Sequence, residues 1–259
     1  MSGHDFSRAV SATKQMLGFS PCGLLFVRFG YETAFMKVKG DQNMHSSKQW
    51  PKVYPILDAS FIPATGRAEF LRRLGDGLAE AGVTLLEYRN KTDAEAELLA
   101  DAAILRAALP AGKVKLILDD RADLIEKIGF DGVHVDAGDL SPAEARKLLG
   151  PDRIIGTFGG GAAGMLPGIL EAPADYLSIG PVFATRTKQT SSPLIGMDGV
   201  RRLRAEAGPG PVLVAIGGIT LATAAEALSA GATLVAIAGA LFRQPDPAAE
   251  FRKWLAELA

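Results

Sequence analysis

From Val53 to the end of the chain, short runs of β-branched and apolar residues alternate with amphipathic helical segments. This alternation is typical of repeated βα units, in which parallel strands are connected by helices that cover the sheet. Eight strands with helical crossovers favour a single closed (β/α)8 barrel, the TIM-barrel architecture of the α/β class. The predicted strands are Val53–Leu57, Val83–Arg89, Val114–Leu118, Gly132–Val135, Arg153–Gly156, Tyr176–Gly180, Val212–Ile216 and Leu234–Ile237.

The helices between these strands carry recognisable start and stop residues. Ser141 before Pro142, and Thr220, are typical of helix starts. Glycines that follow several helices suit a left-handed C-cap, which a residue without Cβ adopts at no cost. The predicted helices include Ala68–Ala81, Glu95–Ala108, Pro142–Leu149 and Ala222–Ala230. Polar and glycine-rich residues then fall just after the strands, the end of a barrel that carries the active site.

The first 44 residues show no sustained hydrophobic period and do not join this rhythm. We therefore expect residues 1–44 to be an N-terminal extension, either a flexible arm or a misassigned start ahead of translation from Met44. Residues 45–259 are then expected to form the catalytic barrel as one domain, a length that barrels commonly occupy.

The amino-acid composition limits the classes of molecule that this chain is expected to bind. Hydrophobic residues make up 48% and charged residues 22% of the chain, a balance typical of globular proteins. The formal net charge of −1 provides no general attraction to nucleic acid or anionic lipid, so we expect neither as a partner. Small phosphorylated substrates, held by local groups, remain compatible. The single cysteine, Cys22, fits a cytoplasmic protein, and the sequence does not indicate an oligomeric state.

The end of the second predicted strand places Glu87, Arg89 and Lys91 at alternating positions, so the three side chains share one face. Arg89 offers a guanidinium fork and Lys91 a point charge, and both suit phosphate oxygens. A solvated, salt-bridged strand end is the other interpretation, and the spacing alone does not decide between them.

Carboxylates follow the next two strands. Asp119 and Asp120 end the third strand, and Asp139 follows the fourth. Two such carboxylates, with substrate phosphate oxygens and water, suit Mg²⁺. The alternative is that Asp119 or Asp120 caps a helix and Asp139 serves a turn. His134, inside the fourth strand, is either a packed, hydrogen-bonded side chain or a general base.

A phosphate site is predicted from the last three strands. The loop after the sixth strand carries Thr185, Thr187 and Lys188, with hydroxyls and cations at close spacing. Gly217–Gly218 follows the seventh strand and Ala238–Gly239 the eighth. Glycines at both turns let backbone N–H groups approach a phosphate, and this pair of loops is a recurrent phosphate site in barrels.

With these residues placed, the chain resembles the thiamine phosphate synthase family from about Tyr54 to Phe242. The resemblance is carried by residues that match in order and spacing: Arg89-Asn90-Lys91, Asp120-Arg121 with Asp123, Gly132-Val133-His134, Asp139, Gly180-Pro181-Val182-Phe183 with Thr185, Thr187 and Lys188, and Ala215-Ile216-Gly217-Gly218-Ile219.

The resemblance implies the coupling of aminopyrimidine methyl pyrophosphate with thiazole phosphate, with release of pyrophosphate by a dissociative, Mg²⁺-assisted mechanism. It implies that Asp120 and Asp139 hold Mg²⁺. Arg89, Lys91 and Lys188 would bind the pyrophosphate, with Arg89 and Lys188 acting on the leaving group. The thiazole phosphate would be bound by Thr185, Thr187, Gly217, Gly218, Ala238 and Gly239.

Four positions depart from the family pattern. Glu87 stands where the family usually has glutamine and Asp119 where it has asparagine, so two acids replace amides that can also donate hydrogen bonds. Phe158 stands at a serine position of the pyrimidine site, and Gly239 replaces a phosphate-binding serine. Glu87, Asp119 and Phe158 are therefore expected to bear on which substrate binds.

Two other functions remain open for such a barrel, because one fold hosts many reactions. One is an isomerase of the thiazole tautomerase type, which does not need the full metal motif. The other is a catalytically silent protein that binds a phosphorylated ligand. Retention of Asp120, Asp139 and Lys188 favours the synthase, while Glu87, Asp119 and Phe158 keep the silent protein open.

Overall fold

The computed structural model describes residues 50–92, 94–185, 187 and 191–259 of the chain. The predicted extension, residues 1–44, lies outside these residues, as do residues 45–49 of the predicted barrel domain. Trp50–Ala259 forms one structural unit.

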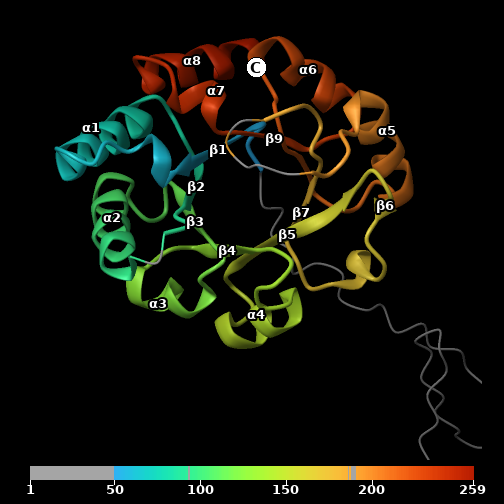
Figure 1. The fold of residues 1–259 in the computed structure, drawn as a ribbon, viewed down its shortest axis with the longest axis horizontal. Helices are drawn as coiled ribbons and strands as arrows, with labels where there is room; N and C mark the ends of the chain where they lie inside the picture. The colour runs from blue at the N-terminus through green and yellow to red at the C-terminus, as the bar shows by residue number, and fades with distance from the viewer. Residues whose placement is uncertain (1–49, 93, 186, 188–190) are drawn as a thin grey trace, which may run out of the picture. The chain divides into compact units, whose positions relative to one another are not determined.

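Eight parallel strands close into a barrel, as predicted (Figure 1). β1 pairs with both β2 and β9, and β4 pairs with β5, so that the sheet returns on itself. The strands are β1 (Val53–Asp58), β2 (Leu85–Arg89), β3 (Lys115–Asp119), β4 (Gly132–Val135), β5 (Ile154–Gly161), β7 (Tyr176–Ile179), β8 (Leu213–Ala215) and β9 (Leu234–Ile237).

Helices surround the ring of strands on the outside (Figure 1). They are α1 (Arg67–Glu80), α2 (Glu95–Ala108), α3 (Ile125–Ile128), α4 (Pro142–Leu149), α5 (Gly196–Ala207), α6 (Leu221–Ser229), α7 (Gly239–Phe242) and α8 (Pro247–Glu257), with 3-10 turns η1 (Ala59–Phe61), η2 (Ala122–Leu124) and η3 (Ile169–Glu171). The predicted bounds of α2 and α4 are confirmed. Ser141 caps α4, as the sequence predicted, and the structure adds a capping box with Glu144.

The fifth barrel strand is longer than the sequence analysis expected. β5 continues beyond Gly156 to Gly161 and turns into a short antiparallel partner, β6 (Gly164–Met165). Backbones approach closely here, because a Cβ on Gly160 would lie 2.6 Å from the carbonyl oxygen of Gly164. The glycine run, which carries no strand-type apolar pattern, is therefore what allows the strand to extend.

Successive side chains of each strand point alternately outward and inward, which divides the core into two layers. In β1, Val53 and Leu57 point outward to the helices, while Tyr54 and Ile56 point into the barrel. The inner layer comprises Tyr54, Ile56, Leu85, Ile117, Ile154, Tyr176, Val214, Leu234 and Ala236. Because both faces of every strand are buried, the strands read as nearly continuous apolar runs, as parallel barrels require.

Arginines in the last turns of three helices form hydrogen bonds with the loops at the N-terminal ends of the strands. Arg146 of α4 donates to the carbonyl oxygens of Gly150, Pro151, Arg153 and Pro173 and pairs with Asp175 at 2.7 Å. The same Asp175 oxygen accepts the backbone N–H of Ile155 in β5 at 2.8 Å. One arginine thus joins a helix end, a strand and the residue before the next barrel strand.

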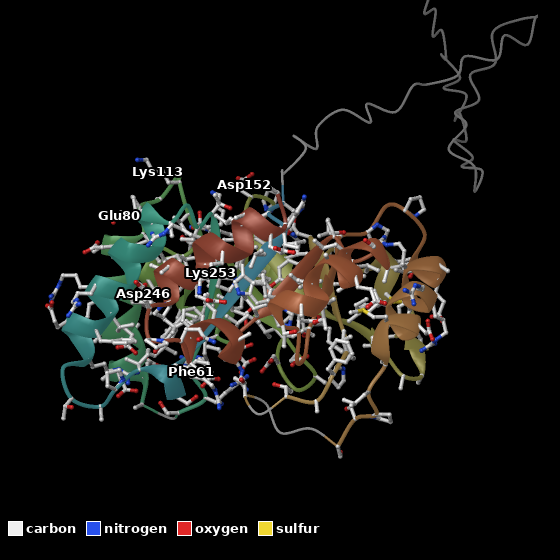
Figure 2. All side chains as sticks on the ribbon, turned by 90° about the horizontal axis from the view of Figure 1, so that it is seen from above. Phe61, Glu80, Lys113, Asp152, Asp246 and Lys253 are labelled. Atoms are coloured by element: carbon white, nitrogen blue, oxygen red, sulfur yellow. The ribbon has the colours of Figure 1, made fainter. Side chains whose placement is uncertain are left out.

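The arrangement recurs at intervals of two βα units. Equivalent contacts link Arg106 of α2 to Asp131, which accepts from Leu116, and Arg204 of α5 to Thr233, which accepts from Leu213. Figure 2 shows Lys113 and Asp152, in loops of this end, opposite to Phe61, which follows β1. These polar contacts therefore lie away from the end where the strands finish.

We predict that Arg146→Ala lowers the free energy of unfolding by about 2–3 kcal/mol, because Asp175 loses its cation and four carbonyl groups lose a charged donor. Urea unfolding monitored by circular dichroism measures this. The exposed neighbour Lys147, changed to alanine, is the matched control and should stay within about 0.5 kcal/mol of the parent. Equal stability of the two variants would contradict this role for Arg146.

Candidate active site

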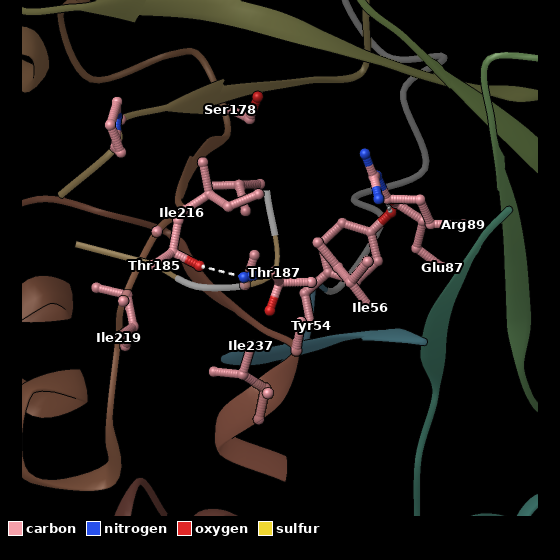
Figure 3. A pocket seen from close by; sticks show the side chains of 18 of the residues that line it. Tyr54, Ile56, Glu87, Arg89, Ser178, Thr185, Thr187, Ile216, Ile219 and Ile237 are labelled. Carbon is pink, nitrogen blue, oxygen red and sulfur yellow. Dashed lines mark hydrogen bonds between the residues drawn. The ribbon is translucent and has the colours of Figure 1, made fainter. Parts of the chain in front are cut away.

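A cavity of about 620 Å³ opens at the C-terminal ends of the strands. Side chains from opposite sides of the barrel point into it, as Figure 3 shows for Glu87 and Arg89 on one side and Thr185 and Ile219 on the other. The predicted site residues that line the cavity are Glu87, Arg89, Asp119, Phe158, Thr185, Thr187, Gly217, Gly218, Ala238 and Gly239. Lys91, Asp120 and Asp139 are not lining residues but belong to the charged cluster at its edge. Lys188 lies outside the described residues.

The two cations at the end of β2, Arg89 and Lys91, lie in a chain of ion pairs. Arg89 pairs with Asp58 of β1 through Nη1, and its Nε lies 3.2 Å from Asp119 Oδ2. Lys91 Nζ lies 2.8 Å from the same Asp119 oxygen and also pairs with Asp120. The cations are therefore salt-bridged, as the second interpretation of this strand end expected, and Arg89 also lines the cavity. Phosphate binding by Arg89 and Lys91 stays a prediction.

Burial acts differently on the two acids that flank Arg89. Burial alone would raise the pKa of Asp58, but hydrogen bonds from Ser60 and the Arg89 guanidinium lower that pKa below its ordinary value. Burial raises the pKa of the Asp119 carboxyl, and the neighbouring Asp120 raises it further against the opposing effect of His134 and Lys91. Of the two acids that flank Arg89, Asp119 is therefore the one that takes up a proton more readily.

Asp120 and Asp139 lie close enough to influence each other. Burial raises the pKa of Asp139, and Asp120 raises it further, against the lowering effect of the Asp136 backbone N–H. Asp120 has a left-handed backbone, with φ of 68°, and its buried Oδ1 has no hydrogen-bond partner. Two adjacent carboxylates with a buried, unsatisfied oxygen form a hard donor set that fits Mg²⁺.

The sequence offered two structural roles for these acids, a helix cap and a turn, and the structure contains only the turn among the described residues. Neither Asp119 nor Asp120 caps a helix, because Arg121 is the N-cap of η2 and no side chain caps it. Asp139 does serve a turn, since its Oδ2 accepts the Asp136 N–H at 2.9 Å. Within the described ranges, no group of three or more His, Cys, Asp or Glu side chains is arranged to hold a metal alone. Substrate oxygens and water would have to complete the coordination.

The floor of the cavity is a hydrogen-bonded chain of buried side chains. Tyr54 Oη donates to Glu87 Oε2 at 2.7 Å and lies 2.9 Å from Tyr176 Oη, which lies 3.0 Å from His134 Nδ1. A phenol has one proton, so Tyr54 accepts from Tyr176 when it donates to Glu87. Tyr176 then accepts from Nδ1–H of His134. His134 is thus packed and hydrogen-bonded, which agrees with the first of the two interpretations of its sequence position.

A glycine makes room for this floor. A Cβ on Gly156 of β5 would lie 1.9 Å from Cζ of the Tyr176 ring. The ring fills that space and meets Tyr54 edge-on, at 5.6 Å between ring centroids. Glu87 is buried beneath the same aromatics, and burial raises its pKa to about 8, with Asp119 adding to the shift. The carboxyl of Glu87 is therefore largely protonated at neutral pH.

The opposite end of the cavity is built from loops after β7, β8 and β9. Thr187 N donates to Thr185 Oγ1 at 3.3 Å, a contact drawn in Figure 3. Gly217 and Gly218 have positive φ values of 99° and 62°, and a Cβ on Gly218 would lie 2.5 Å from the carbonyl oxygen of Ala184. The glycine turn therefore packs directly on the threonine loop, which brings the predicted phosphate-binding residues together.

Several lining residues were not singled out from the sequence as site residues, namely Tyr54, Tyr176, Ile56 and Arg243, and neither was the ion-pair partner Asp58. The alternation of β1 could have indicated Asp58, because Tyr54, Ile56 and Asp58 occupy every second position of a strand that ends at the active face. Arg243 gave no comparable signal, since it follows a short helix rather than a strand.

We predict that Glu87→Gln changes the pH dependence of stability. Because its folded-state pKa of about 8 lies above the ordinary 4.5, the stabilising contribution of Glu87 is fully present below about pH 4.5 and is lost as the pH rises through about 8. From pH 5 to 9 the parent should therefore lose free energy of unfolding relative to Glu87→Gln, as measured by urea unfolding. The exposed Glu257→Gln variant should follow the parent, and parallel curves for all three proteins would contradict the prediction.

Comparisons with known proteins agree with this geometry. The family model for thiamine monophosphate synthase matches residues 53–241. The chain is 40% identical over 209 residues to a thiamine-phosphate synthase of Koribacter versatilis, covering 80% of this chain and 97% of the relative. It is 33% identical over 202 residues to that of Chloroflexus aurantiacus, covering 78% and 90%.

A solved structure is similar as well. A thiamine phosphate pyrophosphorylase from Pyrococcus furiosus superposes with a TM-score of 0.62 at 27% identity, covering 80% of this chain and 96% of that one. The family match runs from β1 to α7 and so includes every strand of the barrel and the cavity at their ends. The chain therefore belongs to the thiamine monophosphate synthase family.

Proposed function

We propose that this chain is a transferase that couples aminopyrimidine methyl pyrophosphate to thiazole phosphate, forming thiamine phosphate and pyrophosphate. The observation that carries the proposal is a single cavity with two different polar ends. Arg89 and the Asp120–Asp139 pair lie at one end, and the Thr185–Gly217 region lies at the other. Such a cavity suits two phosphorylated substrates that meet between the ends.

In this proposal Arg89, Lys91 and Lys188 bind the pyrophosphate, while Asp120 and Asp139 hold Mg²⁺. The metal would neutralise charge on the leaving pyrophosphate as the C–O bond to the pyrimidine methylene breaks. Arg89 is held by Asp58 and Asp119, so its guanidinium is already oriented when that charge develops. Lys91 would exchange its pairing with Asp119 and Asp120 for the phosphate oxygens.

The centre of the cavity would hold the pyrimidine. Glu87 and Asp119 offer it polar contacts, and Phe158 and Ile56 offer apolar surface that excludes water. The thiazole phosphate would bind at Thr185, Thr187, Gly217, Gly218, Ala238 and Gly239. Its ring nitrogen would then face the pyrimidine methylene. After pyrophosphate has left with the electrons of the C–O bond, that nitrogen would form the new C–N bond with the pyrimidine methyl cation, without a protein nucleophile.

The remaining expectations from the sequence stay proposals. We propose a cytoplasmic protein that acts on small phosphorylated substrates, with residues 1–44 as a separable extension. Of the helices formed by the described residues, none is both long and apolar enough to span a membrane.

The tautomerase and silent-protein alternatives both predict that no thiamine phosphate forms from the two substrates, so product analysis with Mg²⁺ separates them from the synthase.

We predict that activity requires Mg²⁺ and that Asp120→Ala or Asp139→Ala lowers turnover by roughly two to three orders of magnitude while the fold is retained. Each variant removes a carboxylate from the Mg²⁺–pyrophosphate site but no core contact. The measurements are thiamine phosphate formation, Mg²⁺–pyrophosphate binding by calorimetry and circular dichroism. Asp123→Ala is the matched control, because this exposed acid pairs with Arg121 and does not line the cavity. Full turnover in excess chelator would refute the assignment.

We further predict that the double variant Glu87→Gln, Asp119→Asn binds aminopyrimidine methyl pyrophosphate more tightly than the parent, and increasingly so from pH 7 to pH 9. Burial raises the pKa of both acids, to about 8 for Glu87, so their repulsion of the pyrophosphate grows over this range. Calorimetric affinities across pH measure the effect. If the acids instead recognise a different heterocycle, the variant loses the parent's activity, and no change in either quantity would place both acids outside the working site.

A further inference from the structure

Arg243 is a cation at the mouth of the cavity that no part of the mechanism above uses. It follows α7, and its exposed side chain lines the cavity with Thr187 and Gly239. This is the end built by the loops after β7, β8 and β9, far along the chain from Arg89 and Lys91. A second cationic position therefore lies at the end proposed for the thiazole phosphate.

An aromatic residue from the other end of the chain holds Arg243 in place. The Arg243 guanidinium carbon lies over the Phe61 ring, 5.4 Å from its centroid. Phe61 in turn stacks on Phe242, with centroids 6.1 Å apart and planes at 26°. Figure 2 shows Phe61 at the end of the barrel opposite to Lys113 and Asp152. Stacking on an aromatic face orients a guanidinium while leaving its N–H groups free to bind.

Gly239 gives the arginine room. A Cβ at this position would lie 3.0 Å from Arg243 Nε, 3.4 Å from Arg243 Cδ and 3.4 Å from Thr187 Oγ1. Gly239 does not have a positive φ, so the backbone itself would accept another residue. What glycine supplies is space for the guanidinium to lie over the turn after β9, beside the threonine hydroxyl.

The charge of Arg243 is not neutralised by a carboxylate of the described residues. Arg89, in contrast, lies between Asp58 and Asp119 in the same cavity. A guanidinium that is oriented, lies beside a hydroxyl and has no acidic partner among these residues is suited to an anion with planar or bidentate oxygens. The glycine turn of Gly217–Gly218 reaches the same end of the cavity.

We propose that Arg243 binds the phosphate of the thiazole substrate directly, with Phe61 and Gly239 as the residues that position it. This inference rests on the proposed function, because it takes the thiazole phosphate as the ligand of that end. It assigns the two ends different chemistry. Arg89 and Lys91 act on the pyrophosphate within an acid-rich cluster, and Arg243 anchors the substrate that keeps its phosphate through the reaction.

The test is the affinity for thiazole phosphate, measured by calorimetry, alongside steady-state KM values for both substrates. Arg243→Ala should weaken thiazole phosphate binding and raise its KM by roughly 10- to 100-fold, the effect of losing a charge-assisted hydrogen bond. The KM for the pyrimidine pyrophosphate should stay within about twofold. Arg243→Lys should recover part of the loss, and the exposed Arg252→Ala of α8 is the control for charge alone.

The same ligand without its phosphate provides a second readout. The unphosphorylated thiazole alcohol should bind the parent and Arg243→Ala equally, since the guanidinium contacts only the phosphate. A loss of equal size for alcohol and phosphate would mean that Arg243 shapes the pocket rather than binding the anion, and would overturn the proposal.

Gly239→Ala tests the positioning, because it adds the Cβ without a hydroxyl that could itself bind the phosphate. Its Cβ should shift the guanidinium and weaken thiazole phosphate binding, whereas in Gly239→Ala, Arg243→Ala the Cβ meets no arginine. The double variant should therefore bind no more weakly than Arg243→Ala, and fully additive losses would overturn the coupling.

If the parent binds thiazole phosphate through Arg243 but forms no thiamine phosphate, the proposed function fails and the inference stands. If the parent forms product and Arg243→Ala binds thiazole phosphate normally, the inference fails alone.

Discussion

The site depends on closure of the barrel, in which β1 pairs with β9. This pairing brings the residues that follow the first strand beside those that follow the last. Phe61 can therefore stack against Phe242 and Arg243. On its other side β1 pairs with β2, which places Asp58 beside Arg89. Each contact joins segments that are distant in the chain, so the cavity exists only when the ring of strands is complete.

Inside the ring, packing sets the electrostatics. Small residues such as Gly156 leave space that the Tyr176 ring occupies, and Tyr176 with Tyr54 covers Glu87. The same burial raises the pKa of Glu87, so an acid at this position keeps its proton to a higher pH than an exposed glutamate would. An acid in place of an amide is thereby tolerated beside a proposed pyrophosphate site.

Stability and chemistry lie at opposite ends of the strands. At the N-terminal end, Arg106, Arg146 and Arg204 satisfy carbonyl groups and pair with the residue before a later strand. At the C-terminal end, like charges lie together and Asp120 keeps a buried oxygen without a partner. The C-terminal end therefore carries unfavourable interactions that a bound cation and phosphates would relieve. The arginine contacts at the N-terminal end can offset their cost in stability.

The order of the eight strands, the barrel, the helix caps at Ser141 and Thr220 and ten of the residues that line the cavity followed from the sequence. Hydrophobic period, glycine stops and polar residues after strands are local signals, and the C-terminal ends of parallel strands meet by geometry. The length of β5, the ion pair of Asp58, the Tyr54–Tyr176–His134 chain and the place of Arg243 were decided only by the tertiary structure. Each depends on the distance between atoms from separate segments, such as Arg243 and Phe61, and no pattern within one segment encodes that distance.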